Sequence, residues 1–208
     1  MPTLEEGAPP LEVPHLPSSV VVLLTDGENT MGPEPMALAR EALTAGCPIL
    51  QLRAKHLDDP SFVELAHELR AACTDSGATF VINDRADIAT MVRADGLHLG
   101  QDDLAVDDAR RIVGDMQIGV STHDLEQALR AERDGADLIA FGPVFETRSK
   151  ENPDPVVGVK RLAEVCRGVK RPVVAIGGIT PKNAAETVAA GASHIAVISA
   201  LPSFLRER

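Results

Sequence analysis

Short apolar runs alternate with longer stretches of helical periodicity along most of the chain. In the stretch Pro60–Ser76, for example, Phe62, Leu65 and Leu69 fall on one face of a helix. Glycine follows several of these stretches, at the positions where helices commonly end. We predict strands at eight mainly apolar runs: Val20–Leu24, Ile49–Leu52, Phe80–Ile82, Gly96–Leu99, Gln117–Val120, Leu138–Phe141, Val173–Ile176 and Ile195–Ile198.

This alternation predicts a single α/β domain. About eight strand–helix repeats in roughly 190 residues are typical of a (β/α)₈ TIM barrel. A doubly wound open sheet shows the same alternation, and periodicity alone leaves it open. No Gly-x-Gly-x-x-Gly follows the first strand, which argues against a dinucleotide-binding version of that sheet. Residues 1–18 are rich in proline and are predicted to be an extended or disordered tail, so the barrel is assigned to residues 19–208.

Composition narrows the classes of function. Aromatic residues make up only 2% of the chain, so the core must be built from Val, Ile, Leu and Ala. The net charge of −11 disfavours nucleic acid and anionic membranes as partners. There is no signal-peptide pattern and no apolar run long enough to span a bilayer. We expect a cytoplasmic protein, compatible with a homo-oligomer, whose Cys47, Cys73 and Cys166 are free thiols.

Polar residues follow nearly every predicted strand, at the edge where ligands bind in either fold. Gln51, Arg53 and Lys55 alternate with apolar residues, so a period of two points all three to one side. In a barrel that side is the interior near the mouth, where two cations would be costly without an anionic ligand. The simpler interpretation is a strand end whose cations reach solvent.

Carboxylates end two neighbouring predicted strands, at Asn83-Asp84 and at Asp102-Asp103. Oxygen ligands without a His or Cys cluster favour Mg²⁺ over Zn²⁺. The competing interpretation is that these residues cap the helices that follow.

Two further segments have the chemistry of phosphate sites. Gly177-Gly178 ends the seventh strand just before a helix, so that a phosphate can approach the backbone at the helix N-terminus. Residues 147–150, Thr-Arg-Ser-Lys, lie in a long loop over 143–155, which could equally be a solvated charged loop. His98 is expected to be a core histidine, whereas His123 is a candidate for proton transfer at the mouth.

From about Val20 to Ala200 the chain resembles the thiamine-phosphate synthase family. The segments that carry the resemblance, in order, are QLRAK (51–55), ND (83–84), GLHLGQDDL (96–104), GVSTH (119–123), FGPVFETRSK (141–150), AIGGITPKNA (175–184) and AVISA (196–200). The resemblance implies a (β/α)₈ barrel that joins two small phosphorylated substrates with the help of Mg²⁺. Hydroxymethylpyrimidine pyrophosphate and thiazole phosphate would give thiamine phosphate and pyrophosphate by a dissociative substitution.

The resemblance also implies a role for each matched residue. Asp84 and Asp103 would bind Mg²⁺, and Gln51 would recognise the aminopyrimidine. The implied catalytic residues are Arg53, Ser121 and Lys150. The residues implied to hold the pyrophosphate are Arg53, Lys55, Asn83, Ser121 and Lys150, and those implied to hold the thiazole phosphate are Thr147, Ser149, Gly178, Ile198 and Ser199.

Three other functions share parts of this pattern. A thiazole tautomerase uses the same barrel and shares the Ser-x-His segment, so His123 does not discriminate, but these isomerases generally lack the full metal and pyrophosphate set. A non-catalytic phosphate-binding regulator needs no paired Mg²⁺ ligands. A phosphosugar isomerase needs an acid/base pair at the mouth, which the Mg²⁺-type acids and cations fit poorly.

Overall fold

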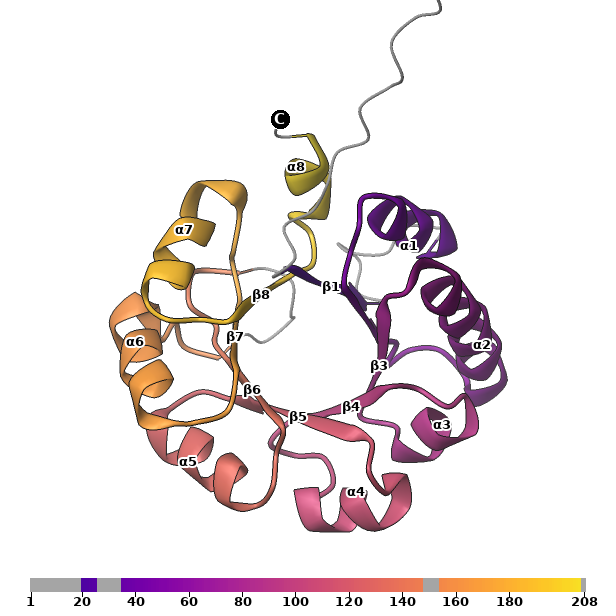
Figure 1. Ribbon diagram of the computed structural model, residues 1–208, viewed down its shortest axis with the longest axis horizontal. Helices are drawn as coiled ribbons and strands as arrows, with labels where there is room; N and C mark the ends of the chain where they lie inside the picture. Colours follow the sequence, from indigo (N-terminus) through magenta and orange to yellow (C-terminus); the bar gives the residue numbers. More distant parts are fainter. Residues whose placement is uncertain (1–19, 26–34, 148–153, 207–208) are drawn as a thin grey trace, which may run out of the picture.

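Eight parallel strands close into a barrel that is surrounded by a ring of helices (Figure 1). The computed structural model describes residues 20–25, 35–147 and 154–206, so the predicted Pro-rich tail lies outside the described residues. The strands are β1 (Val20–Thr25), β2 (Ile49–Arg53), β3 (Thr79–Asn83), β4 (Gly96–Leu99), β5 (Gln117–Thr122), β6 (Leu138–Phe141), β7 (Val173–Ile176) and β8 (His194–Val197). The helices are α1 (Pro35–Thr44), α2 (Asp59–Ser76), α3 (Ala86–Met91), α4 (Val106–Val113), α5 (Leu125–Arg133), α6 (Gly158–Gly168), α7 (Pro181–Ala189) and α8 (Leu201–Arg206).

The closed barrel confirms the predicted fold. Strand β1 pairs with β2 on one side and with β8 on the other, so the sheet has no free edge and the alternative of an open sheet is wrong. Each predicted strand overlaps an observed one, because parallel strands covered by helices are nearly continuous apolar runs that stand out in the sequence.

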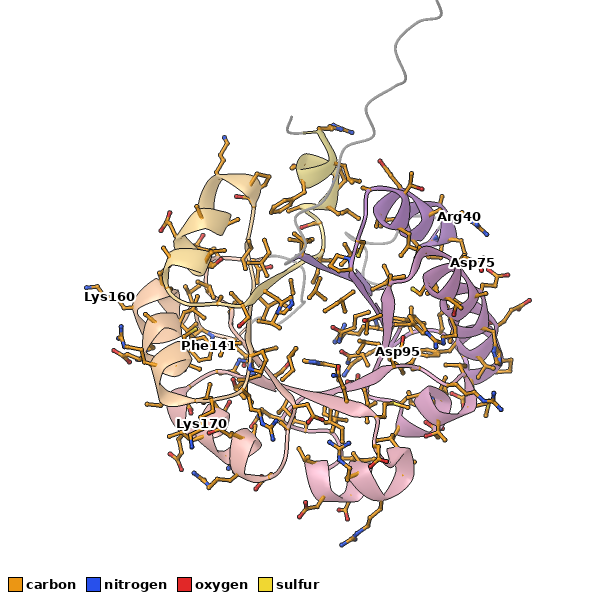
Figure 2. All side chains as sticks on the ribbon, in the orientation of Figure 1. Arg40, Asp75, Asp95, Phe141, Lys160 and Lys170 are labelled. Atoms are coloured by element: carbon orange, nitrogen blue, oxygen red, sulfur yellow. The ribbon has the colours of Figure 1, made fainter. Side chains whose placement is uncertain are left out.

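Alternate strand residues face the helices and the barrel interior. In β3, Phe80 and Ile82 face outward and are fully buried, whereas Val81 and Asn83 line the interior. The larger core therefore lies between the strands and the helix ring. On the outer face of that ring, Arg40 of α1, Asp75 of α2 and Lys160 of α6 point away from the barrel (Figure 2).

Helix α2 illustrates how local sequence sets the element boundaries. Asp58 is its N-cap, and the carboxylate accepts the N–H of Ser61 at 2.9 Å. Gly77 ends the helix in the left-handed conformation, with φ 75°, which glycine adopts without steric cost. None of the helices in the described ranges combines the length and the apolar character that a bilayer crossing needs.

Two aspartates secure the amino ends of the strands, opposite the rim where the strands end. Asp95 precedes β4, and its Oδ2 accepts the N–H of Phe80 at 2.8 Å and Arg70 Nη1 at 2.7 Å. Asp137 precedes β6 and makes the same pair of contacts: its Oδ2 accepts the N–H of Ile118 at 3.0 Å and Arg110 Nη2 at 2.8 Å. Each carboxylate thus joins a strand to a helix-borne arginine through charge-assisted hydrogen bonds.

We expect Cys47 and Cys73 to resist thiol reagents in the folded protein. Both are buried free cysteines, and burial raises the pKa of Cys47 to about 11 and that of Cys73 to about 12. The reactive thiolate is therefore scarce at mildly alkaline pH. With an aromatic disulfide reagent, partly buried Cys166 should react first, and the other two only as denaturant unfolds the chain. Cys166→Ser should remove the fast phase, and a fast phase that persists in this variant would contradict the prediction.

Candidate active site

A cavity of about 510 Å³ opens at the carboxyl rim of the barrel. The predicted site residues in its lining are Gln51, Arg53, Lys55, Asn83, Asp84, Asp103, Ser121, Thr147 and Ile198. A second cavity of about 200 Å³ adjoins it and is lined by Thr147, Gly178, Ile198 and Ser199, among others. Ser149 and Lys150 lie outside the described residues. All the predicted site residues that the structure describes thus converge on one rim.

A hydrogen-bonded row of amides leads from the interior to the carboxylates. Gln51 and Asn83 are only 8% and 7% exposed, and Gln51 Nε2 donates to Asn83 Oδ1 at 2.7 Å. The side-chain amide of Asn83 in turn donates to Oδ1 of Asp84. Because the amides are buried and paired, they orient the Asp84 carboxylate from below.

The predicted cation row also reaches this carboxylate. Gln51 and Arg53 both line the cavity, as the period of two in β2 requires, and Lys55 follows just beyond the strand end. Lys55 Nζ lies 3.0 Å from Asp84 Oδ2, with the lysine side chain 48% exposed and the aspartate 18% exposed. The amino group is therefore accessible from the cavity mouth while it is held beside an acid.

Asp84 and Asp103 share one hydrogen-bonded site. Burial raises the pKa of Asp84 above its ordinary value, and the hydrogen bond to Asp103 raises it further, against the opposing charge of Lys55. Burial also acts to raise the pKa of Asp103, but the hydrogen bonds from Asp84 and from the N–H of Gly100 outweigh it and lower that pKa. The Gly100 N–H donates to Asp103 Oδ2 at 2.7 Å. Because like charges repel, both carboxyl groups are readily ionised together only where a cation lies between them.

This donor set fits Mg²⁺. One or two carboxylates are what Mg²⁺ usually takes from a protein, and water and phosphate oxygens complete its octahedron. Asp84 and Asp103 provide two at the cavity mouth. Within the described ranges, no group of three or more His, Cys, Asp and Glu side chains is arranged to hold a metal. The site is therefore suited to a cation that arrives with a phosphorylated ligand rather than to a closed structural metal site.

His98 is a cavity residue that the sequence interpretation missed. It lines the large cavity instead of lying in the core, and its Nε2 is 2.8 Å from Ser121 Oγ. Gly119 makes room for the ring, because a Cβ at this position would lie 2.8 Å from His98 Nδ1. The signal was available, since Gly96 and His98 occupy alternate positions of β4 in the same way as the polar residues of β2.

His123 lies at the mouth, as predicted. Its Nδ1 is 2.6 Å from the carbonyl oxygen of Gly142 and must donate to it, which directs Nε2 toward Asp154 at 3.5 Å. Both ring nitrogens thus face oxygen atoms of the protein. This arrangement fixes the orientation of the ring at the cavity rim.

The Gly177-Gly178 turn owes its glycines to a neighbouring loop. Both residues have positive φ, 95° and 65°, and a Cβ on Gly178 would lie 2.3 Å from the carbonyl oxygen of Glu146. The backbone of this loop pairs with the turn through the N–H of Phe145, which donates to Gly177 O at 3.0 Å. The glycines therefore allow close packing of two backbones beside the small cavity. The sequence pattern indicated only the approach of a phosphate, not this packing.

Asn183 immobilises the same turn. Its side-chain amide donates to the carbonyl of Gly178 at 3.0 Å, and its oxygen accepts the N–H of Thr180 at 2.8 Å. Both bonds lie at the start of α7, where backbone N–H groups favour negative charge.

Comparisons with known proteins agree with this geometry. Residues 21–201 match the family model described as thiamine monophosphate synthase. The chain belongs to the thiamine-phosphate synthase family. The thiamine-phosphate synthase of Methanocella arvoryzae is 47% identical over 87% of this chain and 86% of its own length, and that of Chloroflexus aurantiacus is 39% identical over 92% and 88%. The solved structure of a thiamine phosphate pyrophosphorylase from Pyrococcus furiosus is 35% identical, covers 90% of this chain and 92% of its own, and superimposes with a TM-score of 0.80.

Membership of the thiamine-phosphate synthase family agrees with the resemblance carried by the sequence motifs. The matched region spans all eight strands from within β1 to β8, so the family assignment covers the whole barrel. Each described residue to which the resemblance assigns a role lines one of the two cavities of that barrel.

The Gly178 turn generates a stability prediction. Gly178→Ala should destabilise the protein more than Gly77→Ala, although both residues have positive φ. A Cβ at Gly77 meets nothing within 4 Å, so that variant carries only the backbone cost of about 1–2 kcal/mol. Gly178→Ala adds a collision with the 143–147 loop. Urea unfolding of both variants measures the difference, and equal losses would mean that the loop shifts aside without cost.

Proposed function

We propose that this chain condenses hydroxymethylpyrimidine pyrophosphate with thiazole phosphate to form thiamine phosphate and release pyrophosphate. The observation that carries the proposal is the convergence of buried amides, cations and paired carboxylates in one cavity, beside a second cavity suited to a separate phosphate. Family membership supports the same reaction.

The larger cavity would bind the pyrimidine substrate. Gln51 would recognise the aminopyrimidine through its amide, and Arg53, Lys55, Asn83 and Ser121 would hold the pyrophosphate together with Lys150 of the following loop. Asp84 and Asp103 would hold Mg²⁺, which when bound neutralises phosphate charge. The attraction between these positive side chains and the departing oxygens grows as negative charge develops on the oxygens. The side chains therefore stabilise the transition state more than the bound substrate.

Bond breaking would precede bond formation. The bond between the pyrimidine methylene carbon and the pyrophosphate oxygen breaks with its electron pair leaving on pyrophosphate. The resulting pyrimidinyl-methyl cation is stabilised by the ring amino group, and the lone pair of the thiazole nitrogen then forms the new C–N bond. No protein nucleophile is needed, and Cys47 and Cys73 are buried in the outer core rather than in the cavity.

The smaller cavity would position the thiazole. Thr147, Ser149 and the backbone of Gly178, Ile198 and Ser199 would hold its phosphate. Fixing this phosphate places the nitrogen in line with the cation, so orientation supplies a large part of the catalysis.

The proposal is tested by an assay with both substrates and the purified chain. Thiamine phosphate and pyrophosphate should form in equal amounts with Mg²⁺, and excess chelator should abolish both. Conversion of a thiazole phosphate isomer without the pyrimidine substrate, and without pyrophosphate release, would instead identify a tautomerase. Full turnover in chelator would exclude the Mg²⁺-assisted reaction.

Asp84 and Asp103 should act as one unit. Asp84→Asn or Asp103→Asn retains the shape but removes a charge that the cation needs, so each should lower kcat/KM by roughly 10²-fold or more. The double variant should be little worse than the worse single variant, because residues that serve one step are non-additive. Steady-state kinetics across a Mg²⁺ titration measures all three.

Asp102→Asn is the matched control for this pair. Asp102 is adjacent in sequence but exposed at the rim, so the variant should remain close to wild type. Multiplicative losses at Asp84 and Asp103, or a larger loss at Asp102, would show that the two carboxylates do not share a site.

A further inference from the structure

The turn that presents Asp84 has an unusual backbone. Asp84 has φ 66°, and the N–H of Arg85 donates to the carbonyl oxygen of Asn83 at 2.8 Å, closing a hydrogen bond across a single residue. A γ-turn with positive φ at its centre is the rare and strained hand. Such a conformation persists only where the surrounding structure holds it in place.

One restraint comes from the neighbouring strand. The N–H of Asp84 donates to the carbonyl oxygen of His98 at 2.8 Å, which extends the β3–β4 ladder by one residue. This bond fixes the start of the turn. It does not restrain the chain beyond Asp84, where the direction of the backbone reverses into α3.

The other restraint is the side chain of Arg85. Its Nε and Nη2 bind the two oxygens of Asp87 in the first turn of α3, at 3.0 and 2.8 Å. Its Nη1 binds Oδ1 of Asp59, the first residue of α2, at 2.6 Å. These three contacts, here named the Arg85 bridge, join the start of α3 to the start of α2.

The Arg85 bridge connects the two loops that carry Lys55 and Asp84, which form an ion pair in the cavity. Asp84 lies between β3 and α3, and Lys55 lies between β2 and α2, so each is close to one end of the bridge. Their side chains meet at 3.0 Å on the cavity side, whereas Arg85 is not part of the cavity lining. The strained turn is thus held from the cavity by Lys55 and from outside by Arg85.

We propose that Arg85 is a positioning residue, which holds the γ-turn so that the Asp84 carboxylate faces the cavity in the geometry that a divalent cation requires. This role rests on the proposed function, in which Asp84 is a metal ligand. An isolated exposed ion pair contributes little to a structure. Arg85 differs because a rigid guanidinium binds two carboxylates from two helices at once.

The test measures metal binding directly, apart from turnover. Mn²⁺ and inorganic pyrophosphate are added together, and their binding to the full chain is followed by water proton relaxation. Arg85→Ala should weaken binding roughly tenfold, the scale seen when a residue that orients a metal ligand is removed. Arg85→Lys should be intermediate, because an ammonium group can satisfy one carboxylate but cannot bridge both. Asp59→Asn, which removes only the negative charge that links the two helices, should also weaken binding.

Two further readouts separate positioning from general damage. In steady-state kinetics, Arg85→Ala should raise the Mg²⁺ concentration needed for half-maximal rate while the KM for thiazole phosphate stays the same. In hydrogen exchange without metal, the segment 83–87 should exchange faster.

Two arginine variants serve as controls. Arg111→Ala removes an exposed Arg–Asp pair on α4, with Asp108 at 2.8 Å, and should bind Mn²⁺ and pyrophosphate like the wild type. Arg70→Ala breaks the contact with Asp95 at the opposite end of the barrel, and should lower Tm without changing metal binding.

Wild-type affinity in Arg85→Ala, or an equal loss in Arg70→Ala, would overturn the proposal while leaving the synthase reaction intact. Failure of the wild type to bind Mn²⁺ with pyrophosphate would overturn both this role and the metal site of the proposed function. Absence of thiamine phosphate from an otherwise metal-binding chain would count against the reaction alone.

Discussion

Parallel pairing of all eight strands into one closed barrel dictates where chemistry can occur. Every strand then ends at the same rim, and every second side chain faces an interior that is only a few residues wide. Small interior residues such as Gly96, Gly119 and Ala140 leave the space below the rim open, so that the polar ends of β2 to β5 surround a cavity. Residues far apart in the chain become neighbours because of this closure, without any contribution from their own local sequence.

Charge is the second constraint on the site. A chain with a net charge of −11 must attract highly charged anions, so the cavity has to reverse the field of the whole molecule locally. Arg53 at the end of β2 and Lys55 just beyond it supply positive charge, but Asp84 and Asp103 line the same cavity. Under the proposed function a cation would lie between these acids and the ligand, and cations and carboxylates would then share one wall for that reason.

The sequence predicted the strands and the inward row that begins with Gln51 because both depend on simple periodicity and on apolar runs. His98 was missed although the same period of two marks it, since one histidine among apolar residues is usually a core residue. The backbone of Asp84 and the bridge of Arg85 could not be predicted. The first depends on a carbonyl of the next strand, and the second on an acid 26 positions earlier in the chain. The glycine at 178 was recognised as special, but its cause, a loop backbone packed against it, is a tertiary contact.

The two aspartates at the amino ends of the strands have a consequence for how such a protein can evolve. Asp95 and Asp137 bind their partners at the end of the barrel opposite the rim that carries the site residues, and each arrangement uses one strand, one helix and one arginine. The side chains that make these contacts are therefore separate from those that line the cavity. Substitutions at the rim can therefore change what the protein binds while the contacts at the amino ends of the strands stay the same. A new activity can then evolve on this barrel without loss of its stability.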